Sequence, residues 1–491
     1  MKELSVRTTN IPGVLVIDLP LHGDSRGWFK ENWQRAKMVA LSLPDFEPVQ
    51  NNMSYNEEAG VTRGLHAEPW DKLISLATGR ILGAWVDLRE GPSFGETFTL
   101  ELGPDQAVYI PRGVANGYQA LEPRTAYSYL VNDHWSLEAK ASYTFVNLAD
   151  PALGIAWPIP LTEATISDAD REHPMLADVT PFPPAKTVIV GAGGQLGRAL
   201  AKALPDAVAL THADLDITDA AAVAAYPWQG VTTIINAAAH TAVDAAESET
   251  GRIAAWRLNV GGVANLVEVA RSRRITLVGV STDYVFDGTS TDHGEDEPVS
   301  PLGVYGQTKA AADALLATLP RHYLIRTSWV TGDGKNFVRT MADLASRGVK
   351  PAVVDDQYGR LTFADDLAAG ILHLLHTNAA FGTYNLTCDG PIVTWCDVAK
   401  RVFELTGREA SDVTPMTTQA YGQGKTLAAR PVHSTLLLDK IKAVGFTPPE
   451  GDARLREYVS ALLEGEPTAS AEATMMSWMS RATVVWSPHA M

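Results

Sequence analysis

The sequence predicts two domains of different fold class, an antiparallel all-β domain followed by an α/β domain with a parallel sheet. Before about residue 184, apolar and polar residues alternate in short runs such as "LISLATGRILGAWVDLR", which is typical of strands in a sandwich or barrel. Beyond it, strand-like runs such as "VTTIINAAAH" alternate with helical stretches such as "AAWRLNVGGVANLVEVARS", which indicates βαβ units. A chain of 491 residues is also too long for a single hydrophobic core, which rarely serves more than about 250–300 residues.

The domain boundary is expected in the stretch "DREHPMLADVTPFPPAK". Its three prolines, Pro181, Pro183 and Pro184, predict a semi-rigid linker. We therefore expect a first domain with its linker at 1–184, a second domain at 185–466 and a C-terminal tail at 467–491.

Composition limits the classes of partner. The formal net charge of −17 disfavours binding to a nucleic acid polymer but is compatible with a local basic pocket for a small phosphate ligand. The spacing of Cys388 and Cys396 fits neither a metal knuckle nor a disulfide framework, which indicates a reducing compartment. No window approaches the roughly 18 apolar residues of a membrane span. We expect a soluble cytoplasmic protein with no membrane partner.

A glycine pattern opens the second domain. In "VIVGAGGQLG", Gly191, Gly194 and Gly197 follow a strand and begin a helix, so the backbone can approach a pyrophosphate that the helix N-terminus stabilises. The next strand, "AVAL", is followed by "THADLD" with no acidic residue at the strand tip. The acidic residue that usually indicates a preference for NADH over NADPH is therefore missing, and the sequence does not decide between the two cofactors.

A tyrosine and a lysine then occur four residues apart in "VYGQTKAAAD". Tyr305 and Lys309 share one helix face, where the ammonium is expected to lower the pKa of the phenol. Such a tyrosine can donate a proton to a carbonyl oxygen while hydride reaches the carbon. A hydroxyl at the end of the strand "ITLVGVST", from Ser281 or Thr282, would hold the same oxygen.

These motifs resemble the extended short-chain dehydrogenase/reductase superfamily and, within it, the dTDP-4-dehydrorhamnose reductase family, over about residues 187–465. The matching pieces include "GAGGQLG", "LDITD", "STDYVFDG", "YGQTK", "RTSWV", "DDQYGRLT" and "RPVHS". The resemblance implies a doubly wound Rossmann domain with a small substrate-binding lobe, using NADPH or NADH. Two departures look peripheral to the chemistry, His240 in place of Tyr and Leu361 in place of Pro.

The same resemblance implies roles for individual residues. The catalytic residues would be Thr282, Tyr305 and Lys309, and the nucleotide sugar would face Asp283, Trp329 and Arg430. The cofactor site or its support would comprise Gly191, Gly194, Gln195, Leu196, Gly197, Asp216, Ala237, Ala238, Ala239, Asn259, Tyr305 and Lys309. From the residues alone, Trp329 can equally be core, Arg430 a surface ion pair and Asn259 a packing amide.

The first domain has its own set of titratable residues. "RGLHAEPWDK" places Arg63, His66 and Lys72 near a strand start, and "ATISDADREHP" supplies Asp168 and Asp170. A neutral histidine polarised by a carboxylate makes a general base near neutral pH. A lone histidine is more often a packing residue, so the spacing alone leaves both interpretations open.

This half resembles the dTDP-4-dehydrorhamnose 3,5-epimerase family over nearly all of residues 1–178, through "DSRGWFKENW", "QNNMSYN", "RGLH", "VDLREGPSFG" and "YIPRGVANGY". The resemblance implies a cupin-type jelly roll without a metal, and the spacing of His66, His134 and His173 gives no ligand pattern. It also implies roles for single residues. His66 would be the base, paired with Asp170, Lys72 would steady enolate charge, Arg63, Gln50 and Asn52 would contact the nucleotide sugar, and Arg26 would reach phosphate.

Two departures from the epimerase pattern bear on the chemistry. Asn116 stands where the family usually has His, and "DHW" has Trp135 where a tyrosine is expected to return a proton from the opposite face of the sugar. Because adjacent strand residues face opposite ways, His134 is not a simple replacement, whereas Tyr127, Tyr129 or water could serve. We hypothesise that the domain exchanges the C3 or C5 proton but reprotonates slowly or at one carbon only.

Together the two halves predict a bifunctional enzyme that epimerises C3 and C5 of dTDP-4-dehydro-6-deoxy-D-glucose and then reduces C4 with NADPH or NADH to give dTDP-L-rhamnose. Two alternatives are an active reductase carrying a cupin that only binds ligand or dimerises, and a non-enzymatic regulatory subunit similar to the reductase. A homodimer through the first domain is expected. The sequence does not decide whether the nucleotide of the substrate is dTDP or UDP.

Overall fold

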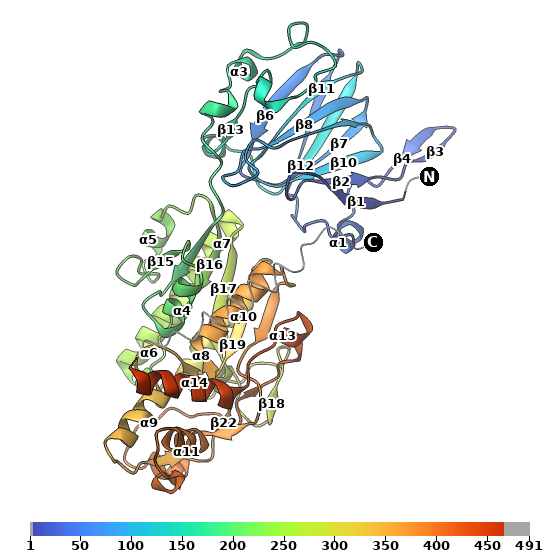
Figure 1. Cartoon of the computed structure of the whole chain (residues 1–491). Coiled ribbons are helices and arrows are strands. Elements are labelled where there is room, and N and C mark those ends of the chain that lie inside the picture. Colours follow the sequence, from blue (N-terminus) through green and yellow to red (C-terminus); the bar gives the residue numbers. More distant parts are fainter. Residues whose placement is uncertain (1–2, 466–491) are drawn as a thin grey trace. The chain divides into compact units, whose positions relative to one another are not determined.

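The computed structural model describes residues 3–465 and divides into two compact units, Met1–Ala185 and Lys186–Met491 (Figure 1). The tail predicted at 467–491 lies outside the described residues. Within the described part of the chain, no helix has the length and apolar character needed to cross a membrane.

The first unit consists of two antiparallel sheets (Figure 1). In spatial order, the six-stranded sheet contains β1 (Ser5–Thr8), β2 (Leu15–Asp18), β10 (Gln106–Ile110), β7 (Lys72–Thr78), β12 (Thr125–Val131) and β5 (Gln50–Asn56). The five-stranded sheet contains β13 (Thr144–Phe145), β6 (Thr62–Ala67), β11 (Val114–Ala120), β8 (Ile81–Asp87) and β9 (Thr97–Leu102). A separate hairpin and three short helices complete the unit: β3 (His22–Asp24), β4 (Gly27–Phe29), α1 (Arg35–Ala40), α2 (Leu137–Lys140) and α3 (Asp168–Arg171).

The core of this unit lies between the two sheets. Ile74 and Leu76 of β7 pack with Trp85 of β8 and Tyr118 of β11, all of them buried. The outer face of the five-stranded sheet is covered by the segment that follows β13, because Leu65 and Val86 pack with Val146 and Leu153. Strand β8 is therefore buried along its whole length instead of alternating between core and solvent.

The second unit is built on a six-stranded parallel sheet. Its spatial order is β15 (Val208–Leu210), β14 (Lys186–Val190), β16 (Val231–Asn236), β17 (Thr276–Thr282), β19 (His322–Thr327) and β24 (Gly382–Asn385). Helices cover both faces: α5 (Ala220–Ala225), α7 (Val263–Arg273) and α8 (Val304–Leu316) on one, and α4 (Gln195–Ala203) and α10 (Ala364–His376) on the other. Successive β14 residues show this, because Val188 packs with Leu266 of α7 and Ile189 packs with Leu200 of α4.

Additional short elements surround a third apolar cluster in the second unit. This cluster is formed largely by α9 (Phe337–Ser346), α11 (Trp395–Leu405) and α14 (Gly451–Glu464), which lie together in Figure 1. The short strand pairs are β18 (Asp292–His293) with β27 (Thr435–Leu436), β20 (Val330–Thr331) with β23 (Thr362–Phe363), β21 (Ala352–Val354) with β26 (Thr414–Met416), and β22 (Tyr358–Gly359) with β25 (Val393–Thr394). The other helices are α6 (Glu249–Trp256), α12 (Thr418–Tyr421) and α13 (Asp439–Ala443).

The predicted order of an all-β part followed by an α/β part with a parallel sheet is confirmed. Much of the predicted linker contacts the first unit. The Phe182 N–H donates to the Leu88 carbonyl at 2.6 Å, and the Phe182 carbonyl accepts from the Glu90 N–H at 3.0 Å. The Lys186 N–H, in contrast, donates to the Gly230 carbonyl of the second unit at 2.9 Å.

Candidate active sites

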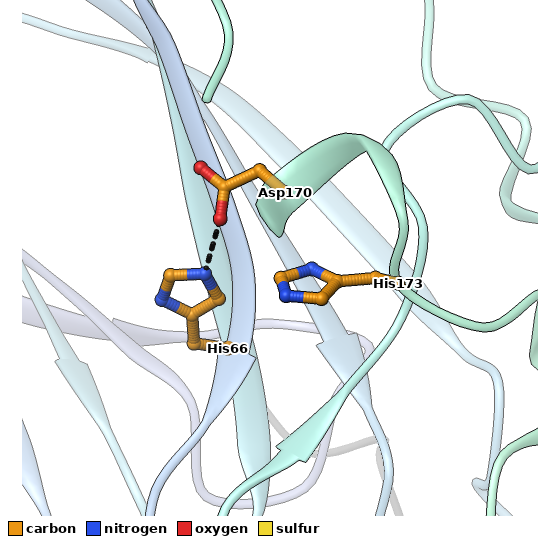
Figure 2. Close-up of side chains that lie close together, drawn as sticks. All are labelled: His66, Asp170 and His173. Atoms are coloured by element: carbon orange, nitrogen blue, oxygen red, sulfur yellow. Dashed lines mark hydrogen bonds and ion pairs between the residues drawn. The ribbon is translucent and has the colours of Figure 1, made fainter. Parts of the chain in front are cut away.

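A histidine and an aspartate from distant parts of the sequence meet in the first unit (Figure 2). The Nε2 atom of His66, on β6, lies 2.8 Å from the Oδ1 atom of Asp170, on α3. The Ser167 hydroxyl caps α3 by accepting from the Asp170 N–H at 3.2 Å, and the second carboxylate oxygen accepts from the Gly64 N–H at 3.4 Å. Figure 2 shows the other His66 nitrogen, Nδ1, turned away from Asp170. Nδ1 is therefore the atom available to act as a base.

The Asp170 carboxylate is suited to support that base. Burial raises the pKa of Asp170, but the hydrogen bond and charge of His66 and the Gly64 N–H outweigh it and bring the pKa below its usual value. An ionised Asp170 stabilises the imidazolium that forms when His66 accepts a proton. As predicted, Asp170 has this position, whereas Asp168 is the first residue of α3.

Two further rings hold the His66 ring in place. The centroid of His66 lies 5.3 Å from that of His173 and 5.4 Å from that of Phe145, and Phe145 stacks on His173 at 4.6 Å. Burial and the nearby His66 lower the pKa of His173, so its ring is neutral at neutral pH. The geometry therefore restricts the orientation of the base without adding a second charge beside it.

The sequence spacing gave no metal pattern, yet His66, Asp170 and His173 place one ligand atom each within 4.8 Å of one another. They form the one group of this kind among the residues that the structure describes. Donor atoms around a tetrahedral zinc ion lie about 3.3 Å apart, and the 2.8 Å between His66 Nε2 and Asp170 Oδ1 is shorter than this. The His66–Asp170 pair is also already joined by a hydrogen bond, so the arrangement fits an acid–base pair without an ion.

A buried lysine faces the same cavity. The Lys72 Nζ atom lies 2.6 Å from the Glu68 Oε2 atom and donates to the Asn116 Oδ1 atom at 2.6 Å. Glu68 also accepts from the Trp70 indole N–H at 2.5 Å, and the Asn116 Nδ2 atom donates to the Tyr127 hydroxyl at 3.2 Å. Burial lowers the pKa of Lys72, and Glu68 acts to raise it.

The cavity has a volume of about 190 Å³ and receives side chains from both sheets. Its lining comprises Ser54, Arg63, Gly64, His66, Glu68, Lys72, Asn116, Tyr118, Tyr127 and Tyr129. His66 projects from the five-stranded sheet, and the last two tyrosines project from β12 of the six-stranded sheet. A ligand between the sheets would thus meet the base on one side and the phenols of Tyr127 and Tyr129 on the other.

Tyr127 and Tyr129 differ in their access to the cavity. Tyr127 is only 4% exposed, and burial raises its pKa well above the usual value. Tyr129 is half-buried, and burial together with the Glu68 charge raises its pKa to about 12. Both phenols are therefore neutral at neutral pH, and Tyr129 is the more accessible proton donor.

The expectation that His134 and Trp135 are strand residues is wrong. Strand β12 ends at Val131, and Trp135 lies in the following loop with 52% of its surface exposed. The alternation of strand faces therefore does not apply to these two residues. Trp135 does not line the cavity, but its N–H donates to the Gln50 Oε1 atom at 3.2 Å.

The other predicted ligand contacts of this unit divide into two groups. Arg63 lines the cavity, whereas Gln50 and Asn52 lie on edge strand β5, where the Gln50 amide donates to the Asn52 Oδ1 atom at 2.8 Å. Arg26 lies on the exposed β3–β4 hairpin and is paired with Asp24 at 2.5 Å. Within this chain, Arg26 does not belong to the cavity lining.

A larger cavity of about 420 Å³ lies at the carboxyl ends of the parallel strands in the second unit. Ligands of open α/β sheets usually bind at this edge. Of the predicted residues, the lining includes Gly194, Gln195, Leu196, Ala237, Ala238, Ala239, Ser281, Thr282, Asp283, Tyr305, Lys309 and Trp329. It does not include Gly191, Gly197, Asp216, Asn259 or Arg430.

The glycine-rich turn borders this cavity. Gly191 has φ +80°, and a Cβ atom there would lie 2.5 Å from the Ala238 nitrogen, so the turn requires glycine. Gly194 is the N-cap of α4, and a Cβ atom on Gly193 would have no neighbour within 4 Å. The open space beside a nine-residue helix N-terminus fits a dinucleotide phosphate.

The predicted catalytic set comes together at this cavity, but the expected pKa of its tyrosine is wrong. Thr282 ends β17, and Tyr305 and Lys309 lie on α8. Burial and the Asp283 charge raise the pKa of Tyr305 far above the usual value. The Lys309 Nζ atom donates to the Val280 carbonyl at 2.5 Å, and burial lowers its own pKa. The i, i+4 spacing thus places the two side chains on one helix face without making the phenol acidic.

Asp283 is a buried carboxyl group beside this set. It is 2% exposed, and burial raises its pKa to about 6. The Thr282 hydroxyl donates to its Oδ1 atom at 2.8 Å. Asp283 therefore orients the hydroxyl that the sequence predicted to hold a substrate oxygen.

Two tryptophans form one wall of the cavity. Trp329 and Trp395 stack with centroids 3.8 Å apart, and both line the cavity. Trp329 is thus buried and also ligand-facing, which combines the two interpretations that the sequence left open. Trp395 was missed, because a tryptophan at the start of a helix in "VTWCDVA" does not differ from a core residue by pattern.

Arg430, Asn259 and Asp216 act around the cavity. The Arg430 Nη2 atom donates to Asp244 at 2.9 Å, and Arg430 also interacts with Tyr284, which lines the cavity. The Asn259 Oδ1 atom accepts from the His240 N–H at 2.7 Å, and its amide donates to the Thr308 hydroxyl at 3.0 Å. Asn259 therefore supports the cavity wall. Asp216, which also lies outside the lining, accepts from the Thr218 N–H at 2.9 Å.

Each unit thus has a cavity with acid–base residues of its own, which defines the class of a two-domain enzyme with two separate active sites. The chain belongs to two families, the dTDP-4-dehydrorhamnose 3,5-epimerase family over residues 8–178 and the RmlD substrate binding domain family over residues 185–464.

Relatives of each half support this assignment. The chain is 52% identical to an RmlC homolog from Streptococcus pyogenes over 35% of this chain and 90% of that protein. It is 39% identical to a dTDP-4-dehydrorhamnose reductase from Aggregatibacter actinomycetemcomitans over 55% of this chain and 97% of that protein. The crystal structure of a dTDP-4-dehydrorhamnose reductase from Bacillus anthracis in complex with NADP is 31% identical, with a TM-score of 0.52 over 56% of this chain and 98% of that chain.

Proposed function

We propose that the chain is a bifunctional enzyme that converts dTDP-4-dehydro-6-deoxy-D-glucose to dTDP-L-rhamnose. The observation that carries this proposal is the presence, in one chain of these two families, of His66, Asp170 and Lys72 at one cavity and of Thr282, Tyr305 and Lys309 at another. The names of the relatives support the dTDP-sugar as the substrate of both sites.

The first reaction is epimerisation next to the C4 ketone. The Nδ1 atom of His66 removes the proton from C3 or C5, and Asp170 stabilises the resulting imidazolium. The enolate charge develops on the C4 oxygen, where an ammonium stabilises it most strongly in a site without water. Lys72 supplies this charge, since two of its three N–H groups bond to Glu68 and Asn116 and the third is available to the sugar.

Reprotonation needs a donor on the opposite face of the sugar ring. Tyr129 lines the cavity from the sheet opposite to His66, and its phenol is neutral at neutral pH. We assign Tyr129 as this acid in place of the tyrosine that the sequence lacks at position 135. The hypothesis of impaired reprotonation rested on that position, which lies in a loop outside the cavity lining.

The second reaction is reduction of C4. NADPH is the proposed cofactor, because a related reductase structure contains NADP and because the glycine turn and the N-terminus of α4 leave room for a pyrophosphate. When bound, it supplies the hydride. Tyr305 donates its proton to the C4 oxygen, the Thr282 hydroxyl turns from Asp283 to donate to that oxygen, and Lys309 holds the Val280 backbone beside them.

The remaining predicted residues are proposed as substrate contacts. Asp283 and Trp329, with the additional residue Trp395, line the reductase cavity, and Arg430 reaches it through Tyr284. Arg63 lines the epimerase cavity, and Gln50, Asn52 and Arg26 are assigned to the nucleotide on family resemblance. The finer folds proposed are a cupin-type jelly roll for the first unit and a doubly wound Rossmann domain with a small lobe for the second. The two packed antiparallel sheets and the parallel sheet with helices on both faces support them.

A homodimer through the first unit is proposed as well. Strand β5 is an edge strand, and two of its large side chains are exposed, Met53 at 66% and Tyr55 at 54%. An exposed edge of this kind can pair with a second chain. The protein is proposed to act in the cytoplasm, in line with Cys388 and Cys396, which are both buried free thiols.

The deciding experiment separates the two reactions. The protein is incubated in D₂O with dTDP-4-dehydro-6-deoxy-D-glucose, with and without NADPH, and the sugars are identified by mass and NMR. Deuterium at C3 and C5 without NADPH, and dTDP-L-rhamnose with it, are the expected results. Reduction of pre-epimerised sugar without any deuterium exchange would instead show a reductase with a binding module. The absence of both reactions would contradict the assignment as an enzyme.

A further inference from the structure

The Glu68 carboxylate is the closest charged partner of Lys72 at the epimerase cavity. Both side chains are almost fully buried, with 10% and 5% of their surfaces exposed. Their atoms lie 2.6 Å apart, and the Trp70 indole N–H holds the same Glu68 oxygen at 2.5 Å. Glu68 is therefore fixed on both sides, by an ammonium and by an indole.

Asn116 fixes Lys72 from another strand. Its Oδ1 atom accepts from the Lys72 ammonium at 2.6 Å, and its Nδ2 atom donates to the Tyr127 hydroxyl at 3.2 Å. The side-chain amide carries no charge, so it directs the ammonium without changing the net charge of the site. The position that usually holds His in the epimerase family thus becomes a neutral link between Lys72 and the tyrosines of β12.

We infer that Glu68 is a positioning residue for the epimerase reaction, which keeps the Lys72 ammonium protonated and directed, together with Asn116, at the oxygen of the enolate. Without a carboxylate, an ammonium buried to this extent loses its proton more readily. Removing one partner of a buried pair also leaves an uncompensated charge. Since Lys72 acts only when charged, Glu68 would set the upper pH limit of epimerisation. This inference rests on the proposed epimerase function.

The other groups at the cavity do not replace Glu68. Arg63 and His66 lie on β6 and are cationic or neutral, and Tyr127 and Tyr129 of β12 and Tyr118 of β11 are neutral phenols with raised pKa values. Of the groups named in this lining, Glu68 is the one carboxylate. The Lys72 Nζ atom also lies 5.6 Å from the centroid of the Tyr129 ring, which is a weaker interaction than a charge pair.

The experiment measures deuterium entry into dTDP-4-dehydro-6-deoxy-D-glucose without NADPH, as a function of pH, for the wild type and Glu68→Gln. Glutamine keeps the size of the side chain and can still accept from the Trp70 N–H. We expect kcat to fall about tenfold or more near neutral pH, the alkaline limb of the profile to move to lower pH, and KM to change little. Glu101→Gln, which removes an exposed pair with Arg80, is the matched control and keeps the wild-type profile.

Two further variants make the result independent of folding. Glu68→Asp keeps the charge but retracts it, and its alkaline limb should lie between those of the wild type and Glu68→Gln. In a Lys72→Arg background, Glu68→Gln should leave the pH limb in place, because arginine does not lose its proton. A wild-type alkaline limb in Glu68→Gln would overturn the inference. If that variant does not fold, an alkaline limb that Lys72→Arg does not move to higher pH would overturn it instead. Absence of exchange in the wild type would instead contradict the proposed function.

Discussion

Each of the two cavities contains a buried lysine, and the two lysines are held in different ways. Burial lowers the pKa of both Lys72 and Lys309. Lys72 has a carboxylate at 2.6 Å, whereas Lys309 donates to a backbone carbonyl, and Asp313, whose charge acts on Lys309, is itself paired with Arg326 at 3.3 Å. The first lysine therefore has a dedicated counter-charge that suits charge stabilisation, and the second is proposed to hold the Val280 backbone in position.

The proton donors differ in a parallel way. Tyr129 is half-buried and reaches its cavity from the sheet opposite to the base. Tyr305 lies next to its partners on one helix and strand, where burial and the Asp283 charge raise its pKa. In the proposed mechanism both sites use a neutral phenol, but only the epimerase site needs a separate base.

The largest expected effect comes from removing the reductase phenol. Tyr305→Phe should lower the rate of NADPH oxidation in the presence of the dTDP-4-dehydro-6-deoxy sugar about 10²–10⁴-fold, because the substitution removes the proton that the C4 oxygen receives. Cofactor binding, measured by fluorescence titration, should change only a few-fold. Deuterium exchange at C3 and C5 in the same variant serves as the internal control and should be unchanged. Near-normal turnover would show that a different group is the acid.

Removing the epimerase phenol should have a smaller and more selective effect. Tyr129→Phe leaves His66 and Lys72 in place, so proton removal continues while inversion falls by about 10²-fold. Exchange and inversion are followed together by NMR in D₂O. Trp135→Tyr is the matched comparison, and it should change inversion by less than about twofold, because that residue lies outside the cavity lining. Faster inversion in Trp135→Tyr would restore the hypothesis that this position carries the acid.

The sequence predicted the partners in these sites better than their environments. The pairing of His66 with Asp170, 104 residues apart, followed from family motifs, since no local pattern joins a strand to a distant helix. The Glu68–Lys72 pair was missed, because charged residues in "EPWDK" are typical of a solvated turn and burial there depends on the other sheet. The spacing of Tyr305 and Lys309 predicted their shared face, but the pKa of the phenol depends on Asp283 and on burial, which spacing does not report.

Two carboxyl groups extend the comparison to pH. The pKa of Asp170 is lowered by His66, so its ionised form adds stability that is present above the unfolded pKa and is lost as pH falls through the folded pKa. Asp283 is the opposite case, because burial raises its pKa from 3.8 to about 6. Its ionisation removes stability as pH rises from about 4 to about 6, by an amount on the order of 3 kcal/mol.

Asp283→Asn should therefore raise the melting temperature of the second unit near neutral pH by a few degrees and leave it unchanged near pH 4, where the wild-type carboxyl group is protonated. Calorimetry at the two pH values measures this difference. Asparagine keeps an oxygen that can accept from the Thr282 hydroxyl. Asp287→Asn, which alters a partly buried carboxylate of the same loop with a lowered pKa, is the control and should not stabilise the protein. Equal melting temperatures for Asp283→Asn and wild type at neutral pH would contradict the raised pKa.

The smallest effect is expected from separating the two units. A fragment that begins at Lys186 should fold and reduce pre-epimerised sugar within about twofold of the full chain, because all predicted reductase residues lie beyond this point. The partners of the backbone hydrogen bonds also change from the first unit to the second just before this cut. Phe182 bonds to Leu88 and Glu90 in the first unit, while the Lys186 N–H bonds to Gly230 in the second. A fragment that begins at Val190 is the informative counterpart, since it lacks most of β14, which lies between β15 and β16 in the sheet. Circular dichroism and NADPH oxidation should therefore show a folded, active fragment only for the first cut, and loss of activity in both would mean that the reductase site depends on the epimerase unit.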